Sequence, residues 1–386
     1  MTNRSITFIY SDSVQKQVYE MIAAEAQKRG YRTKLTNNRF EKCDIGWYCE
    51  HVNFPQYSRF SVIMLHDLTQ QYNNWPNIWI REPWNKYDIG FLPNDIWADN
   101  WKQCSMKFYA NTRKGVYVTG WPKADRISTF VDHKKIDDYR KKLGLIPDKP
   151  TVLYAPAWEN DGKQDEFVRA MLPLDVNILI KQAPWPDTYE EQLKNIAEMR
   201  ELHKNIPQVI QLDPRTNILD AVMVSDMLVS EESSTMCECV MMGKPVISVY
   251  NWLIPDVTPS RFPADDYEYA IKTKKEDLTE CVKEVINNYR VFAEEARNYS
   301  KEHFSNIGKS IPIMMDILDA TIRKKETPYP ALQPQKGDKL SFSEYRLYLI
   351  ERIKREISYN YCIQSKAVAF LWNIARGIYR KCKYNG

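Results

Sequence analysis

The hydrophobic pattern of the first third of the chain alternates short, continuous apolar runs with longer amphipathic segments. The apolar runs are rich in β-branched and aromatic residues and lie at 6–10, 31–35, 44–48, 61–66, 86–92 and 115–120. Between the first two runs, residues 14–30 carry apolar side chains at helical spacing. Buried strands separated by helices are typical of βαβ units with a parallel sheet. The pattern therefore predicts an α/β, Rossmann-like domain over residues 1–128.

The same pattern starts again after a polar helical stretch that ends near residue 150. Apolar runs follow at 151–156, 176–181, 209–212, 226–230 and 245–250, with helical segments between them. We expect a second doubly wound, Rossmann-like domain over residues 129–326. Ligands of open α/β sheets bind beyond the carboxyl ends of the strands, so the two domains should face a cleft that holds the active site.

Residues 327–386 differ in character from the two domains. The first part, 327–338, contains three prolines and a glycine and is typical of a linker. Residues 339–386 repeat apolar and aromatic side chains at helical spacing and hold ten Lys or Arg against three Glu, a net charge of +7. Such a helical tail fits an anionic membrane surface. The alternative is that these helices pack back across the two domains.

The overall composition, 44% hydrophobic and 27% charged, is that of a folded globular protein. The N-terminus lacks the apolar core of a signal peptide, and no window has the apolar length of a membrane span, so the sequence predicts a cytoplasmic location. A tail that binds lipid adds a peripheral location on the inner face of the cell membrane. The eight cysteines form no CxxC pair and are expected to be reduced thiols. Because the basic residues concentrate in the tail, nucleic-acid binding is disfavoured.

The strongest local signal is VSDMLVSEESSTMCECVMMGKPVISV at 224–249, a strand that leads through Glu231, Ser233 and Ser234 into a helix. Hydroxyl groups and free backbone amides at a helix N-terminus form an anion site. A carboxylate one turn into the helix, Glu238, is placed to hold ribose hydroxyls. The alternative is that the serines only cap the helix and that Glu238 is a solvated residue.

Four segments resemble, in the same order, motifs of the CDP-glycerol glycerophosphotransferases, the teichoic-acid and capsule enzymes with a GT-B fold. The segment at 224–249 resembles their "sDxLITDxSS…GkPxi" block, and the other three are SVIMLHDLTQ, VYVTGWPKADRI and TVLYAPAWENDGK. The resemblance spans about residues 60–250. It implies a GT-B transferase with a nucleotide donor, CDP-glycerol, and a lipid-linked or polymer acceptor.

By the same resemblance, His66 corresponds to the general base that takes the proton of the acceptor hydroxyl. An imidazole that titrates near neutral pH is suited to that role. The neighbouring Asp67 replaces the glycine of the family pattern, and it either orients His66 or acts as the base itself. The family's histidine after a phosphate-binding lysine is Ala183 here, while Lys181 remains as the cation. These departures leave the identity of the donor open.

Further cations follow predicted strand or loop ends, namely Lys123, Arg215 and Arg261. Arginine forks suit phosphate oxygens, although surface arginines are common. The five histidines are far apart and no Asp-x-Asp pair lies in an apolar context. We therefore expect a transfer without metal or other cofactor, in which side chains and helix dipoles stabilise the charge.

Residues 73–101 hold five of the 11 tryptophans. Tryptophan faces stack on sugar rings, so an acceptor loop is one interpretation of this segment. The other, which we favour, is that most of these indoles pack in the core.

Three functions from different classes remain open. The first is a transferase that moves glycerol phosphate from CDP-glycerol to a hydroxyl of a cell-surface polymer or lipid-linked acceptor. The second keeps the fold and uses a CMP-, UDP- or GDP-linked sugar in capsule or lipopolysaccharide synthesis. The third is a non-catalytic scaffold with the GT-B shape.

Overall fold

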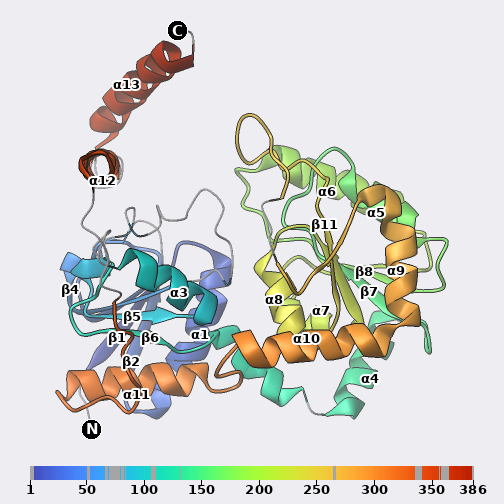
Figure 1. The fold of residues 1–386 in the computed structure, drawn as a ribbon, viewed down its shortest axis with the longest axis horizontal. Helices are drawn as coiled ribbons and strands as arrows, with labels where there is room; N and C mark the ends of the chain where they lie inside the picture. The colour runs from blue at the N-terminus through green and yellow to red at the C-terminus, as the bar shows by residue number, and fades with distance from the viewer. Residues whose placement is uncertain are drawn as a thin grey trace.

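The chain folds into two α/β domains that lie side by side and are followed by two extended helices (Figure 1). The computed structural model describes residues 4–49, 53–65, 68, 79, 82, 84–105, 110–130, 132–263, 267–334, 341–355, 357 and 365–384.

The first domain is built on a parallel sheet of six strands in the order β2-β1-β3-β4-β5-β6. The strands are β1 (Ser5–Ile9), β2 (Arg32–Thr36), β3 (Cys43–Cys49), β4 (Ser58–Met64), β5 (Ile89–Leu92) and β6 (Val116–Val118). Its helical elements are α1 (Ser13–Lys28), η1 (Pro55–Tyr57), η2 (Trp84–Lys86) and α3 (Asp95–Cys104). The strand order reverses direction beside β1, as in a doubly wound sheet.

The second domain repeats this architecture with the order β12-β11-β10-β7-β8-β9, again all parallel. The strands are β7 (Thr151–Tyr154), β8 (Asn177–Ile180), β9 (Val209–Gln211), β10 (Met227–Ser230), β11 (Val246–Val249) and β12 (Ile271–Thr273). The helices are α4 (His133–Leu143), α5 (Lys163–Met171), α6 (Glu190–His203), α7 (Ile218–Val224), α8 (Ser234–Met241), η4 (Lys275–Asp277), α9 (Leu278–Asn287) and α10 (Tyr289–His303). Central strands β7, β8, β10 and β11 are buried along their whole length, which explains their mostly apolar sequences.

The chain then returns to the first domain through α11 (Ser310–Ile322). Figure 1 shows α10 running below the second domain and α11 continuing below the first. Six apolar residues of α11 belong to the core that contains β1 and α1, and Arg29, the residue after α1, binds Asp316 at 2.6 Å. This packing differs from the predicted boundary, because residues 310–322 lie within the range 129–326 but belong to the first domain.

A second junction between the domains lies at η3 (Pro122–Thr129) and the residue before it. Trp121 packs in the core of the second domain, whereas the carboxylate of Asp125 accepts hydrogen bonds from the amides of Ser310 and Ile311 at 2.8 Å each. Leu68 follows β4 in the first domain, yet its side chain is also buried in the core of the second. These contacts join the two sheets near the carboxyl end of β4.

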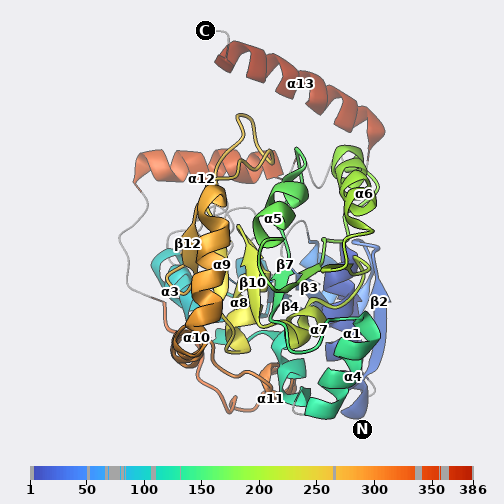
Figure 2. The same ribbon diagram turned by 90° about the vertical axis from the view of Figure 1, so that its right-hand side faces the viewer.

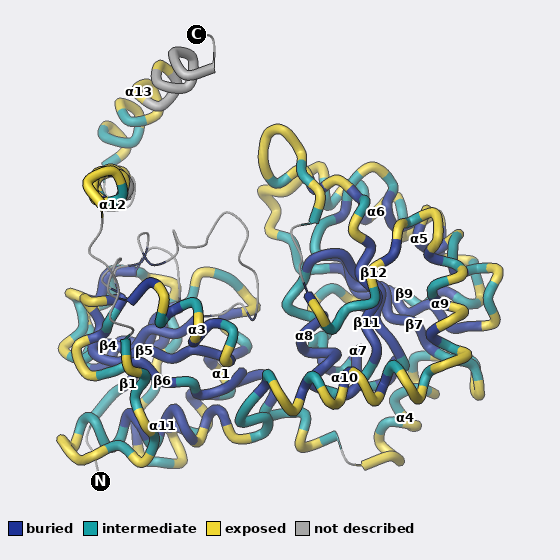
Figure 3. Tube along the Cα trace, viewed as in Figure 1, coloured by how far each residue is buried: buried dark blue, intermediate teal, exposed yellow. Residues whose placement is uncertain are grey.

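The last two helices, α12 (Phe342–Arg355) and α13 (Lys366–Tyr384), lie apart from the domains. Figures 1 and 2 show α13 projecting away from the body in both views. Tyr348 of α12 packs against the first domain, but large apolar side chains of both helices are exposed, including Phe342 at 86% and Phe370 at 66% (Figure 3).

The tryptophan-rich segment at 73–101 packs as we favoured from the sequence. All four of its described indoles are fully buried in one cluster of the first domain: Trp79, Trp84, Trp97 and Trp101. Edge contacts join the first of them to the second and the third. The described tryptophans of this segment therefore present no indole face to a ligand.

Candidate functional site

The predicted site residues of the second domain follow the carboxyl ends of β8, β9, β10 and β11, apart from Glu238, which lies inside α8. Ser233 is the N-cap of α8, and its hydroxyl accepts a hydrogen bond from the amide of Thr235 at 3.1 Å. The hydroxyl of Ser234 accepts one from the backbone of Leu68 at 3.2 Å. Both serines are half-buried. The N-terminus of α8 therefore lies at the junction of the domains, where its free backbone amides could bind an anion between them.

Glu238 is 1% exposed and is held by two residues of the junction between the domains. One of its carboxylate oxygens accepts from the indole of Trp121 at 2.9 Å and from the ammonium group of Lys123 at 2.6 Å. The structure places Glu238 in a buried ion pair at the domain junction, so it is not the solvated residue of the alternative, and its contact with a ribose stays a prediction.

Lys181 follows β8 and is 7% exposed. Its ammonium group donates to the carbonyl oxygens of Gln182 at 3.0 Å and Pro214 at 2.8 Å. Desolvation, together with the positive charge of Lys123, lowers the pKa of Lys181 to about 8. Two ammonium groups and the carboxylate of Glu238 thus share one buried region, and the exposed carboxylate of Asp213 also acts on Lys181.

The two predicted arginines differ in their surroundings. Arg215 is exposed and lines, with Arg126 and Asn217, a pocket of about 400 Å³ against α1 of the first domain. Arg261 forms a fork with the buried carboxylate of Glu232, at 2.9 and 3.0 Å, and also binds Asp256. Arg261 therefore fixes the loop that follows β11, while Arg215 faces a cleft between the domains.

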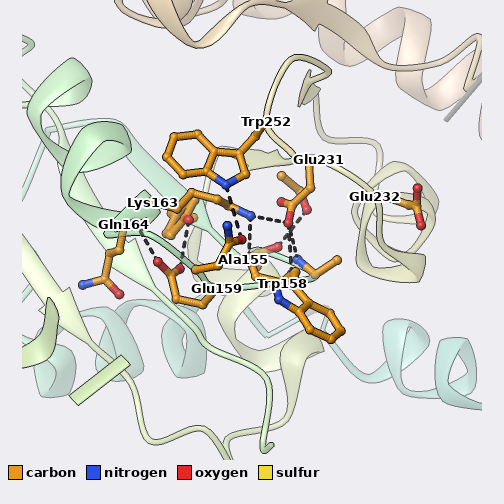
Figure 4. Close-up of polar contacts among 12 residues, drawn as sticks. Ala155, Trp158, Glu159, Lys163, Gln164, Glu231, Glu232 and Trp252 are labelled. Carbon is orange, nitrogen blue, oxygen red and sulfur yellow. Dashed lines mark hydrogen bonds and ion pairs between the residues drawn. The ribbon is translucent and has the colours of Figure 1, made fainter. Parts of the chain in front are cut away.

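Glu231 lies at the centre of a buried polar cluster in which sequence reasoning missed the other members (Figure 4). Its carboxylate pairs with Lys163 of α5, and both side chains are 0% exposed. The same oxygen accepts from the amides of Ala157 and Trp158, at 3.0 Å each. Figure 4 shows Glu232 pointing away from this cluster.

Glu159 is a second buried carboxylate, on the loop between β7 and α5, and its oxygens accept from the amide of Gln164 at 2.8 Å and the side chain of Gln182 at 3.2 Å. Burial raises the pKa of the Glu159 carboxyl, and the charge of Lys163 acts against that shift. In the sequence, Glu159 and Lys163 look like ordinary polar loop residues, so only the position of WENDGK after a predicted strand hinted at a role.

Three aromatic rings meet on the loops after β7 and β8. The ring centres of Trp158 and Trp185 are 4.7 Å apart at 76°, and Tyr189 lies 4.9 Å from Trp185. Trp185 comes two residues after Ala183, at the place where the sequence departs from the family pattern. An aromatic cluster thus lies on the segment where the family pattern has a histidine.

The predicted general base His66 and its neighbour Asp67 lie outside the described residues. On either side of them in the chain, the amide of Leu65 bonds to the carbonyl of Phe91 at 3.3 Å, and the carbonyl of Leu68 accepts from Asn94 at 2.7 Å. Among the described residues, no three His, Cys, Asp or Glu side chains converge as metal ligands. Within the same residues, no helix is both long and apolar enough to cross a membrane.

Comparison with known proteins supports the resemblance found in the sequence. The sequence model of the family "CDP-Glycerol:Poly(glycerophosphate) glycerophosphotransferase" matches residues 80–270. No curated protein sequence matches the chain significantly.

The fold is similar to that of several solved structures. A structure of the wall teichoic acid polymerase TagF soaked with CDPG has 16% sequence identity and a TM-score of 0.58, over 83% of this chain and 89% of that one. A putative UDP-N-acetylglucosamine 2-epimerase from Listeria monocytogenes has 13% identity and a TM-score of 0.58, over 86% and 100% of the two chains. The MnaA–UDP structure from S. aureus has 12% identity and a TM-score of 0.58, over 88% and 100%. With two parallel six-stranded sheets and a helical C-terminal region, the fold is of the GT-B type.

Proposed function

We propose that this chain, a transferase that resembles the CDP-glycerol glycerophosphotransferases, moves glycerol phosphate from CDP-glycerol to a hydroxyl of a cell-surface polymer or a lipid-linked acceptor. The observation that carries the proposal is the pair of buried ammonium groups at the domain junction. Lys123 and Lys181 are both at least nine-tenths buried there, with Glu238 as the buried carboxylate. Buried charge is unfavourable unless it is paired, so a phosphate group would complete the site.

In this mechanism the serines and the cations contact different parts of the donor. The amides at the N-terminus of α8, with Ser233 and Ser234, would hold the pyrophosphate, and Lys181 would neutralise the departing nucleotide. Arg215 would extend the cationic surface into the cleft, and Glu238 and Arg261 would fix the surrounding loops. His66, or Asp67 in its place, would take the proton from the acceptor hydroxyl. Phosphoryl transfer of this kind depends on positioning and electrostatic support, and we propose that no metal or other cofactor takes part.

A second candidate, a nucleotide-sugar glycosyltransferase, is favoured by one observation. The half-buried rings of Trp158 and Trp185 lie with Tyr189 beside Ala183, and aromatic faces suit a sugar ring better than a linear glycerol unit. Thermal-shift measurements with CDP-glycerol, CMP-sugars, UDP-sugars and GDP-sugars separate the two, because a ligand of the folded state raises its melting temperature. A shift with CDP-glycerol above all others supports the proposed function, and a larger shift with any sugar donor overturns it.

The double substitution Ser233→Ala with Ser234→Ala is expected to weaken donor binding by about tenfold, because two hydroxyl contacts to phosphate are lost while the helix dipole remains. Titration of CDP-glycerol by calorimetry measures the change. The matched control is Asp132→Ala, which removes the N-cap of α4, a helix that lies at the bottom of the second domain in Figure 1. That variant should lose stability but keep its donor affinity. Unchanged donor affinity in the folded double variant would mean that the serines only cap the helix and do not bind the donor.

We propose further that the tail binds the anionic inner face of the cell membrane, where a lipid-linked acceptor would be found. Removing residues 365–386 deletes α13 with five basic and no acidic residues but keeps Tyr348, which packs on the first domain. At about 1 kcal/mol per basic residue near the surface, partition onto anionic vesicles should fall by at least tenfold. Co-sedimentation with vesicles of phosphatidylglycerol measures it, with neutral phosphatidylcholine vesicles as the control. Equal binding of both proteins would remove the membrane role.

A further inference from the structure

The ion pair of Lys163 and Glu231 is fully buried, and the proposed mechanism has no use for it. Removing two charges from water costs free energy, and hydrophobic residues of similar volume often stabilise a protein as well or better. A buried pair is therefore weak evidence for a role in stability. Its contacts point to a different role.

The pair holds two residues of the loop between β7 and α5. Glu231 accepts from the amides of Ala157 and Trp158, and Lys163 donates to the carbonyl of Trp158 (Figure 4). The hydroxyl of Ser230 adds a bond to the carbonyl of Ala155 at 2.8 Å. The loop is thus attached to the end of β10 by its backbone, independently of its side chains.

The attached segments carry the groups that face the cleft. On one side, the held residue Trp158 contributes its ring to the cluster with Trp185. On the other side, Glu231 comes two residues before Ser233, the N-cap of α8. One carboxylate therefore sets the distance between the aromatic loop and the serine loop.

We infer that the Lys163–Glu231 pair is a positioning device that sets the β7–α5 loop against the N-terminus of α8, so that the transferred group is aligned for attack. Neither residue touches the donor, because both are fully buried. This assigns Glu231 a different role from the donor contact that the sequence suggested. A misplacement of about 1 Å near the reacting group costs on the order of 100-fold in rate. The turnover arm of the test below rests on the proposed function.

The test uses the full chain with two variants whose stabilities and activities should fall in opposite orders. Lys163→Met with Glu231→Met removes both charges and the acceptor of the two amides. Glu231→Gln keeps an acceptor oxygen for Ala157 and Trp158 but leaves the lysine without a carboxylate. Because an unpaired buried charge is strongly destabilising, Glu231→Gln should melt below the double variant. In turnover of CDP-glycerol, however, the double variant should lose about 100-fold in kcat with a smaller change in KM, and Glu231→Gln should lose less.

Glu159→Gln is the matched control, since Glu159 is a buried carboxylate of the β7–α5 loop whose hydrogen bonds go to Tyr154, Gln164 and Gln182. Its kcat should equal that of the wild type. If activities follow melting temperatures in all variants, or the folded double variant keeps its kcat, the pair is merely structural and the inference is overturned.

Hydrogen exchange provides an arm that needs no donor. The amides of Ala157 and Trp158 should exchange at least tenfold faster in the double variant, because their acceptor is gone, while the amide of Gln164 stays protected. Unchanged exchange at residues 157 and 158 overturns the inference. If these two amides exchange faster in the double variant as expected, but the wild type does not turn over CDP-glycerol, the proposed function fails and the positioning role stands.

Discussion

Replacing His66 by alanine is expected to lower turnover by about 10² to 10⁴-fold while donor affinity stays nearly unchanged. The physical reason is that a positioned base acts on the acceptor hydroxyl only in the chemical step, whereas donor binding depends on the serines and cations of the second domain. Single-turnover rates with the donor that gives the largest thermal shift measure the effect. His133→Ala is the control, because His133 is exposed at the start of α4, away from the domain junction.

A substitution of Asp67, the neighbour of His66, tests which of the two residues is the general base. Asp67→Asn should cost less than His66→Ala if the carboxylate only orients the imidazole, and as much or more if it is itself the base. The wild-type rate should rise with pH through about 6.5, where a free histidine loses its proton, and His66→Ala should lose that rise. Wild-type turnover in the His66 variant removes the residue from the mechanism and leaves Asp67 as the base.

The sheets were predictable from the sequence because buried parallel strands leave a direct signal. Continuous runs such as TVLY at β7 and VISV at β11 are mostly apolar and are buried at every position, since both of their faces are covered. The helix N-terminus at Ser233 was predictable for a similar reason, because N-caps depend on local sequence. The short edge strand β12 and the helix α3 left weaker patterns and were not predicted.

The parts that the sequence did not predict depend on partners distant in the chain. An amphipathic pattern shows that α11 buries one face, but it does not show that the face packs on β1 and α1, almost 300 residues earlier. The charges of Glu238 and Arg261 look free in the sequence, yet Lys123 and Glu232 neutralise them in the fold. Candidate site residues can therefore be named from motifs. Whether another side chain of the protein already pairs with their charge follows only from the tertiary structure.

Lys181 should make donor binding depend on pH in a way that the other cations do not. Burial and the charge of Lys123 lower its pKa to about 8, so in the free protein it is mostly protonated at pH 7 and mostly neutral at pH 9. A phosphate group binds the protonated form, and bound phosphate in turn raises the pKa. Affinity for CDP-glycerol should therefore be highest below pH 8 and fall by about tenfold between pH 7 and pH 9.

The lowered pKa of Lys181 affects stability in the opposite direction, because the free energy of unfolding rises with pH whereas donor affinity falls. Between about pH 8 and 10.5 the unfolded chain binds a proton that folded Lys181 does not, so the free energy of unfolding from this group rises with pH over that window. Weaker donor binding at pH 9 thus cannot be ascribed to loss of the folded state through Lys181. Melting temperatures of the free protein at pH 7 and pH 9 test this directly.

Two substitutions assign the pH dependence to this residue. Lys181→Met should lose roughly 10 to 100-fold in affinity at pH 7, because a charge-assisted hydrogen bond to phosphate is worth about 1.5 to 3 kcal/mol, and its affinity should no longer vary with pH. Lys181→Arg keeps a charge that does not titrate in this range, so its affinity should stay nearly constant from pH 7 to pH 9. Calorimetric titration of CDP-glycerol at the two pH values measures all three proteins. A wild-type pH dependence that persists in Lys181→Arg would assign the titration to another group and leave Lys181 without a role in binding the donor phosphate.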